Sequence, residues 1–324
     1  MSPSRAASPG REPAVAEWAG LLPIDKPIGV TSHDVVARAR RRLGVRAIGH
    51  LGTLDPNASG LLVLAIGAAT RCAIVWQGGE KTYAGTARFG LTTDTQDTQG
   101  RVLSESSARP SEAAVRAAAR TLTGDLAQVP PMVSALKHDG ERLYAIARRG
   151  ETVERAPRAV HVAAWRWLEF ALDQARFEVV CSGGTYVRTL VHDLGQRLGC
   201  GAALAELRRL QSEPFSIERA CPWAELDGEA PASPLAEWGV PLDRALETLP
   251  ALVLAPAQAE AIGLGQSPRV EPGPAPVGQG PRSVVFRAAD GRALALGELL
   301  RAGDGVHARP AVVFPWTVRT GGPK

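Results

Sequence analysis

The stretch IGHLGTLDPNASGLLVLAIG, residues 48–67, joins a polar, glycine-containing turn to an uninterrupted apolar run. The apolar residues 61–66 are typical of a strand that is buried on both faces. Asp55 lies in the turn just before this strand, together with His50 and Thr53. Polar loops on a rigid strand are a common place for reactive groups. Asp55 is therefore the first candidate for a functional residue.

A structural role for Asp55 is the alternative. Asp-Pro pairs often begin turns, and the aspartate side chain can cap its own backbone. However, Gly49, Gly52 and Gly60 flank Asp55 and would allow a ligand to approach the backbone closely. This setting favours the functional interpretation.

Composition limits the class of protein. The chain has 324 residues, a net charge of +4 and a pI near 9.1. Its length suits two domains, and its mildly basic balance suits a polyanion partner without requiring one. Arginine far outnumbers lysine, which favours phosphate and base contacts. A GC-rich genome is the simpler cause of this bias, because it raises alanine, glycine and proline as well.

The four cysteines have no metal-ligand spacing, so we expect reduced thiols in a cytoplasmic protein. Residues 1–19 combine proline, serine and charge, which predicts a disordered tail and neither a signal peptide nor an anchor. The longest apolar run, residues 61–69, is too short to cross a membrane. Motifs for nucleotide cofactors or catalytic zinc are missing from the sequence, so we expect no cofactor and no metal.

The order of the expected elements predicts an α+β fold. Strands are expected at 61–66, 81–90, 159–170 and 175–184, and helices at 32–44, 111–124 and 185–199. We take Ser32 as the N-cap of the first helix and Gly44 as its end. Neighbouring strands without a helix between them favour a mixed, largely antiparallel sheet over a doubly wound parallel one.

The composition and pattern of the sequence change after about residue 250. A loop rich in proline and glycine covers residues 272–281, and a hairpin is expected to turn at Asp290 and Gly291. We therefore expect a large domain over residues 20–245 and a small β-rich domain over residues 250–320.

Arg188 is placed unfavourably for its own helix. A cation in the first turn opposes the helix dipole, at a cost of about 0.3–1 kcal/mol. Its side chain either points into water or faces an anion. If that anion is Asp55, the arginine lowers the pKa of the carboxyl and keeps it ionised inside a pocket. A nucleophile or a general base requires such a carboxylate.

Tyr83 and Tyr186 are two of the three tyrosines, and each lies beside a strand edge or a glycine-rich segment. Each ring either packs in the core or stacks on a nucleic-acid base, a contact worth about 1–3 kcal/mol. Spacing alone does not favour one alternative over the other.

Several motifs, collinear over about residues 20–220, together resemble the TruB-type tRNA pseudouridine synthases. They are LLPIDKPIGVTSHDVV (21–36), GHLGTLDPNASGLL (49–62), KTYAGTARFGLTTDTQDTQG (81–100), VPPMVSALKHDGERLYAIARRG (129–150) and CSGGTYVRTLVHDLGQRLGCGAALAELRRLQSEPF (181–215). The resemblance implies an enzyme that isomerises the T-loop uridine of tRNA without metal or cofactor. It also implies a PUA-like RNA-binding domain at the C-terminus, where the match is weaker.

The resemblance assigns roles residue by residue. Asp55 matches the catalytic aspartate, which attacks either C6 of the uracil or C1′ of the ribose. Arg188 matches the arginine that pairs with it, and Tyr83 matches the tyrosine that stacks on the flipped base and helps to remove the C5 proton. The substrate-binding residues that the resemblance implies are His50, Tyr186 and Leu207, together with Lys26 as a supporting basic residue.

The segment of about residues 125–158 resembles the RNA-gripping insertion of the same family. It implies a basic clamp for RNA phosphates, whose residues here are Lys137, Arg142, Arg148 and Arg149. The implied partner is the T-arm stem-loop of tRNA. We expect a monomer that needs neither guide RNA nor a protein partner and is not bound to a membrane. The alternative is a tRNA-folding factor of the same fold that binds RNA without catalysis.

Overall fold

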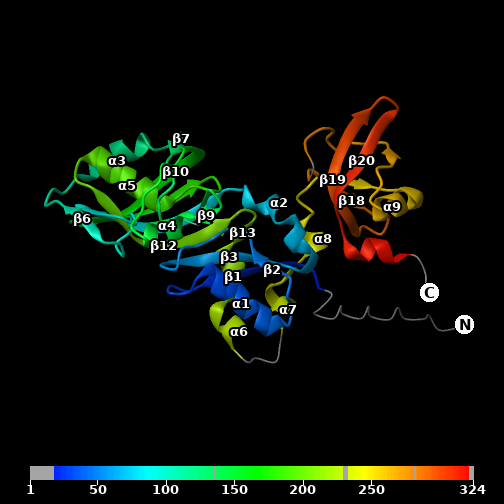
Figure 1. Cartoon of the computed structure of the whole chain (residues 1–324), viewed down its shortest axis with the longest axis horizontal. Helices are drawn as coiled ribbons and strands as arrows, with labels where there is room; N and C mark the ends of the chain where they lie inside the picture. The colour runs from blue at the N-terminus through cyan, green and yellow to red at the C-terminus, as the bar shows by residue number, and fades with distance from the viewer. Residues whose placement is uncertain (1–17, 135, 229–232, 281, 321–324) are drawn as a thin grey trace, which may run out of the picture.

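The computed structural model describes residues 18–134, 136–228, 233–280 and 282–320. A large sheet with helices packed against it is joined to a smaller C-terminal sheet (Figure 1). Most of the tail expected over residues 1–19 lies outside the described residues. Its last two residues belong to the fold: Trp18 packs against the core, and the carbonyl of Ala19 accepts a hydrogen bond from the Leu242 amide at 2.9 Å.

The large sheet is mixed and mainly antiparallel, as predicted. Its main path runs β14-β1-β3-β12-β4-β11-β10-β7, and the β1–β14 and β3–β12 pairs are parallel. The strands of this path are β1 (Gly20–Lys26), β3 (Ala58–Ile66), β4 (Lys81–Phe89), β7 (Gly124–Gln128), β10 (Arg158–Phe170), β11 (Gln174–Cys181), β12 (Ala202–Ser212) and β14 (Cys221–Pro222). Three short strands pair beside it: β2 (Ile48–His50), β13 (Phe215–Ser216) and β15 (Val240–Pro241).

Both faces of β3 are buried, which explains its uninterrupted apolar run. Leu62 and Leu64 belong to one core, which they share with α1 (Ser32–Leu43), α3 (Glu112–Arg120) and α5 (Val187–Leu198). Leu61 and Val63 point to the opposite face and join a second core. The alternation of the strand therefore supplies apolar side chains to two layers at once.

The N-cap of the first helix is not the residue that was predicted. Thr31, and not Ser32, is the N-cap of α1: its hydroxyl accepts from the Asp34 amide at 3.0 Å, and the Asp34 carboxylate accepts from the Thr31 amide at 3.0 Å. This reciprocal pair satisfies two amides that the helix leaves unbonded. Ser32 lies one residue inside the helix, and its hydroxyl bonds Leu54 instead. Gly44 ends the helix in a left-handed conformation, as predicted.

Helix α3 is shorter than the helix predicted over residues 111–124. Ser111 caps α3, but the helix ends at Arg120, and Gly124 opens strand β7. The hydroxyls of Thr121 and Thr123 donate to the last helical carbonyls, at 2.7 and 3.1 Å. These threonines satisfy the end of the helix before the glycine is reached.

The remaining elements around the large sheet are short. They are α2 (Ile74–Gln77), β5 (Leu91–Thr93), β6 (Val102–Glu105), β8 (Lys137–His138), β9 (Glu141–Arg142), α4 (Leu143–Arg148), α6 (Trp223–Asp227), α7 (Pro234–Trp238) and α8 (Leu242–Ala245). The β8–β9 hairpin and α4 form the basic insertion. No helix in the described ranges has the length and apolarity needed to span a membrane.

The C-terminal sheet has the order β16-β18-β19-β20-β17, as expected for a small β-rich domain. Its elements are β16 (Ala251–Val253), α9 (Pro256–Gly263), β17 (Arg269–Val270), β18 (Val284–Arg287), β19 (Ala293–Ala302) and β20 (Gly305–Val313). The predicted hairpin joins β18 to β19, and Gly291 takes a positive φ of 87° in its turn.

The two sheets share one apolar core. Leu21 and Leu61 of the large sheet cluster with Phe314, which follows the last strand of the small one. Arg71 spans the same contact, and its Nη1 donates to the Val313 carbonyl at 2.8 Å. The C-terminal sheet is therefore packed against the large domain.

Candidate active site

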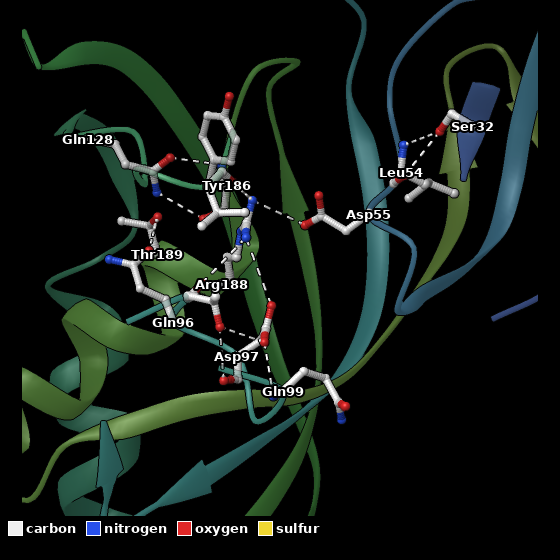
Figure 2. A network of polar contacts seen from close by, with 12 residues as sticks. Ser32, Leu54, Asp55, Gln96, Asp97, Gln99, Gln128, Tyr186, Arg188 and Thr189 are labelled. Atoms are coloured by element: carbon white, nitrogen blue, oxygen red, sulfur yellow. Dashed lines mark hydrogen bonds and ion pairs between the residues drawn. The ribbon is translucent and has the colours of Figure 1, made fainter. Parts of the chain in front are cut away.

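The loop that carries Asp55 is fixed at several points. The hydroxyl of Ser32 donates to the Leu54 carbonyl at 3.0 Å and accepts from the Leu54 amide at 2.9 Å (Figure 2). The Asp55 carbonyl accepts from the Ala58 amide at 3.0 Å, which closes the turn into β3. The backbone around Asp55 is thus held independently of the Asp55 side chain.

Arg188 reaches Asp55 from the first turn of α5 (Figure 2). Nη2 of Arg188 lies 3.4 Å from Oδ2 of Asp55. The arginine side chain is 5% exposed, whereas the aspartate side chain is 45% exposed. The contact that the resemblance implied is present. Of the two alternatives that the helix dipole left open, the one in which Arg188 faces an anion is confirmed and the one in which it points into water is wrong.

Other acceptors also surround the guanidinium of Arg188. The Val133 carbonyl accepts from Nη2, and the Thr95 carbonyl accepts from Nη1 at 3.4 Å. Oδ2 of Asp97 lies 3.9 Å from Nη1. Because the cation is buried among these groups, its removal would leave two carboxylates without their main counter-charge.

Two opposing effects set the pKa of Asp55. Burial raises the pKa of this carboxyl; Arg188 lowers it, Asp97 raises it and Lys26 lowers it by smaller amounts. Arg188 thus lowers the pKa of Asp55, as predicted, but desolvation raises it by more, so that the pKa lies above its ordinary value. A carboxylate with a raised pKa is more basic than an ordinary one, which suits attack on a substrate.

Asp55 and Arg188 line a cavity of about 400 Å³. Its walls are the Asp55 loop, strands β4 and β12, and the start of α5. Cavities of this size lie in the range that binds small organic groups. The predicted catalytic and substrate-binding residues that line it are His50, Asp55, Tyr83, Tyr186, Arg188 and Leu207.

The two tyrosines of the cavity are neutral phenols at neutral pH. Burial raises the pKa of Tyr83, which is 8% exposed, and the nearby Arg209 guanidinium lowers it by a smaller amount. Burial likewise raises the pKa of Tyr186, whose ring centroid lies 6.0 Å from the guanidinium carbon of Arg188. Both neutral rings therefore line the cavity, each beside an arginine.

His50 is also neutral. Burial lowers the pKa of its imidazole, and the nearby Arg209 and His33 lower it further. Its Nδ1 is buried and has no hydrogen-bond partner among the described residues.

Lys26 was predicted to be a supporting basic residue of the substrate site. Its side chain is fully buried and is not among the residues that line the cavity. Nζ donates to the carbonyls of Val30 and Pro27 at 2.7 and 2.9 Å and reaches the Pro56 carbonyl at 3.5 Å. Burial lowers its pKa to about 8, although Asp55 raises it. Lys26 therefore supports the turn beside Asp55 from within the protein.

Arg209 lines the cavity but was not singled out in the sequence. It is 3% exposed; its Nε donates to the Leu61 carbonyl at 2.6 Å and its Nη2 to the Gly52 carbonyl at 3.2 Å. The period of two along β12 puts Leu207 and Arg209 on one face. That spacing is the signal that could have found it, once Leu207 had been assigned to the pocket.

Lys81 is a second such residue. It lies two residues before Tyr83 on β4 and lines the same cavity. Its Nζ donates to the carbonyls of Gly79 and Gln77, at 2.6 and 3.1 Å. Burial lowers its pKa.

The glycines near Asp55 serve different purposes. Gly60 has a φ of 98°, and a Cβ at this position would lie 2.3 Å from the Arg209 carbonyl oxygen. Gly60 therefore allows β3 and β12 to approach each other, and the expected approach of a ligand is wrong at this position. Gly52 lines the cavity, where a Cβ would come no closer than 3.7 Å to Arg209. A Cβ at Gly49 would meet nothing within 4 Å.

The insertion carries the residues expected in the RNA clamp. Lys137 lies in β8; Arg142 and Arg148 are exposed residues of β9 and α4. Arg149 is already paired: it contacts Glu141, and its Nε lies 2.8 Å from Glu151. The charge of Arg149 is therefore largely matched within the insertion.

The four cysteines are buried free thiols, as predicted. Burial raises the pKa of Cys72 and of Cys181 to about 11 in each case. Among the residues that the structure describes, no cluster of three or more His, Cys, Asp or Glu side chains could hold a metal ion.

Comparison with known families identifies the class of protein. A family model described as TruB family pseudouridylate synthase (N terminal domain) matches residues 40–187. A second, described as tRNA pseudouridylate synthase B C-terminal domain, matches residues 188–247. The fold and the cavity are thus those of a pseudouridylate synthase.

Two relatives narrow this assignment, and both are called tRNA pseudouridine synthase B. The protein of Opitutus terrae is 51% identical over 202 residues, which cover 62% of this chain and 84% of the relative. The protein of Geobacter sulfurreducens is 46% identical over 250 residues, or 77% of this chain and 82% of the relative. The chain belongs to the TruB family of pseudouridylate synthases.

Solved structures extend the likeness to the C-terminal sheet. The crystal structure of the archaeal box H/ACA sRNP Nop10-Cbf5 complex matches with a TM-score of 0.69 at 24% identity. The match covers 97% of this chain and 91% of that one. At this identity the likeness concerns the fold, which includes the five-stranded sheet and is consistent with the expected PUA-like domain.

Proposed function

We propose that this protein is a stand-alone tRNA pseudouridine synthase that converts the T-loop uridine, position 55 of tRNA, to pseudouridine. The observation that carries the proposal is the contact between Asp55 and the buried Arg188 in a cavity of about 400 Å³. Membership of the TruB family and the names of the relatives support the reaction and the tRNA substrate.

The reaction exchanges one bond for another within a single nucleotide. The uridine first leaves the base stack and enters the cavity. Asp55 attacks the nucleotide, and the bond between C1′ and N1 breaks. The uracil turns and C1′ bonds to C5; the bond to Asp55 breaks, which frees its carboxylate. The C5 proton leaves, and N1 takes up a proton. Atoms therefore balance without an oxidant, a reductant or a second substrate.

The other lining residues suit a flipped base. The Tyr83 ring would stack on the uracil and would help to remove the C5 proton. Tyr186 and Leu207 would contact the base and sugar, and the neutral His50 would occupy part of the space that the base leaves in the RNA. Lys26 would act indirectly, through the turn at Pro56.

The insertion would hold the T-arm outside the cavity. Its exposed basic residues, Arg142 and Arg148 among them, suit phosphate contacts. We further propose that the protein acts in the cytoplasm as a monomer and needs no guide RNA.

One assay tests this function. Unmodified tRNA that carries tritium at C5 of its uridines is incubated with the purified protein, and the released label is measured. We expect release at the T-loop uridine in the absence of guide RNA. A folded protein that binds tRNA but releases no tritium would be the RNA-folding factor without catalysis, and the proposal would be refuted.

A further inference from the structure

The helix that carries Arg188 begins without a cap of its own. Tyr186 is the N-cap of α5, and its side chain makes no capping hydrogen bond. The buried cation of Arg188 follows two residues later, where the helix dipole opposes it. The position of this first turn must therefore be set by groups outside the helix.

Gln128 supplies such a contact. It is the last residue of β7 and is 3% exposed. Its Oε1 accepts from the Tyr186 amide at 2.8 Å, and its Nε2 donates to the Tyr186 carbonyl at 3.1 Å (Figure 2). Two bonds from one planar amide fix both the distance and the rotation of the backbone that they hold.

The contact acts on the turn that positions Arg188. The Tyr186 carbonyl that accepts from Gln128 also accepts from the Leu190 amide at 3.1 Å, the first hydrogen bond of the helix. The segment that follows Gln128 then returns to α5, where the Val133 carbonyl accepts from Arg188 Nη2. The end of β7 and the segment that follows it therefore contact both the backbone before Arg188 and the guanidinium of Arg188.

We propose that Gln128 is a positioning residue for pseudouridine formation, which fixes the first turn of α5 so that Arg188 meets Asp55. This inference rests on the proposed function of Asp55. It predicts an effect on the chemical step and on the ionisation of Asp55, and not merely on folding.

The pH at which Asp55 takes up a proton distinguishes a positioning role of Gln128 from an effect on folding alone. The charged groups that face its carboxylate are Arg188 from α5, Asp97 from the loop after β5, and Lys26 from β1. Of these, Arg188 opposes the effect of burial most strongly. If Arg188 moves away, the pKa of Asp55 rises further, and activity is lost at a higher pH. A purely structural defect would lower the amount of active protein and leave the pH profile in place.

The experiment compares Gln128→Met with Thr86→Val in the full-length protein. Methionine keeps the volume of Gln128 and removes both hydrogen bonds. Thr86 is a buried residue of β4 whose hydroxyl bonds Glu206 at 3.1 Å, so its loss removes a comparable bond from the same sheet away from α5. Tritium release from a T-arm stem-loop is measured in single turnovers at saturating protein and across pH, together with RNA affinity and thermal unfolding.

We expect Gln128→Met to lower the single-turnover rate about 10- to 100-fold and to shift the acid limb of its pH profile upward, with RNA affinity retained. Thr86→Val should leave both unchanged. If the wild type is active and Gln128→Met leaves both its rate and the acid limb of its pH profile unchanged, the role of Gln128 is refuted and the proposed function stands. A wild type that releases no tritium would overturn the proposed function as well. If Gln128→Met fails to fold, Gln128→Asn retains an amide that falls short of Tyr186 and must show the same upward shift.

Discussion

Arg188 in the cavity and Arg149 in the insertion each lie beside carboxylates, but their surroundings differ. Arg188 is almost fully buried and lies 3.4 Å from Asp55. Arg149 is exposed and makes closer contacts with Glu141 and Glu151. The shorter ion pairs are thus found where water and salt screen them most.

The contrast shows that the length of an ion pair does not rank its importance. An exposed pair can break and be replaced by water, so its loss changes little. The buried Arg188 has no such replacement, and its field acts on a carboxylate whose pKa burial has already raised. Substitutions in the cavity should therefore change the reaction rate strongly, whereas substitutions in the insertion should change RNA affinity slightly.

The largest effect is expected at Asp55. Asp55→Asn keeps the shape of the side chain and removes the attacking oxygen, so tritium release should fall by a factor of at least about 1,000, with RNA binding retained. Asp25→Asn is the matched control, because Asp25 forms a two-point pair with Arg208, at 2.9 and 2.7 Å, and is not a cavity residue. Similar losses in the two variants would refute the special role of Asp55.

The next effect is expected at Arg188. Arg188→Met should lower the rate of tritium release about 100-fold or more, because it removes the cation that orients and stabilises Asp55. Arg197 lies on the same helix, is exposed, and bonds the Thr121 hydroxyl at 2.9 Å. Arg197→Met should therefore leave the rate nearly unchanged. Equal losses would argue against the Asp55–Arg188 contact as the cause.

The pH profile tests the cavity without a substitution. The pKa of Asp55 is raised, so its carboxyl takes up a proton at a pH at which an ordinary aspartate is still ionised. If the ionised form attacks, single-turnover rates should fall on the acid side at a pH above the ordinary aspartate range. RNA affinity serves as the control and should stay level through the same fall. A profile that is flat down to the ordinary range would contradict the raised pKa.

The smallest effects are expected in the insertion. RNA affinity should fall steeply with salt, and each phosphate contact should add roughly 0.7–0.9 to the slope of log affinity against log salt. Because Arg149 is already paired, Arg149→Ala should reduce this slope by much less than that. The double variant Glu141→Gln/Glu151→Gln frees Arg149 and should steepen the slope. Titrations at several salt concentrations measure both, and a full unit lost in Arg149→Ala would mean that RNA displaces the two glutamates.

The sequence predicted the elements with strong periodicity and the contact between Asp55 and Arg188. The position of Arg188 in the first turn of its helix pointed to an anion, and the resemblance to the TruB-type synthases implied that this anion is Asp55. Gln128 gave no such signal, since its partner Tyr186 lies 58 residues further along the chain. Arg209 was hidden for a similar reason: its neighbour Arg208 is also an arginine, and only the register of β12 decides which one faces the cavity.

The sequence also did not show how deeply each side chain of the site would be buried. Lys26 matched a family position, but its ammonium lies fully inside the protein. The lowering effect of Arg188 on the pKa of Asp55 was predicted, because a neighbouring charge can be inferred from a motif. The larger effect of burial was not, because desolvation depends on every element packed around the site.

The apolar core shared by the two sheets has a consequence for cooperativity. Leu21 and Leu61 are covered in part by the C-terminal sheet through Phe314, so neither sheet can unfold without exposing apolar surface on the other. The two domains should therefore melt in one calorimetric transition, with equal van't Hoff and calorimetric enthalpies. The spacing between the cavity and the C-terminal sheet is accordingly a fixed dimension of the enzyme, and a substrate that spans both must conform to it.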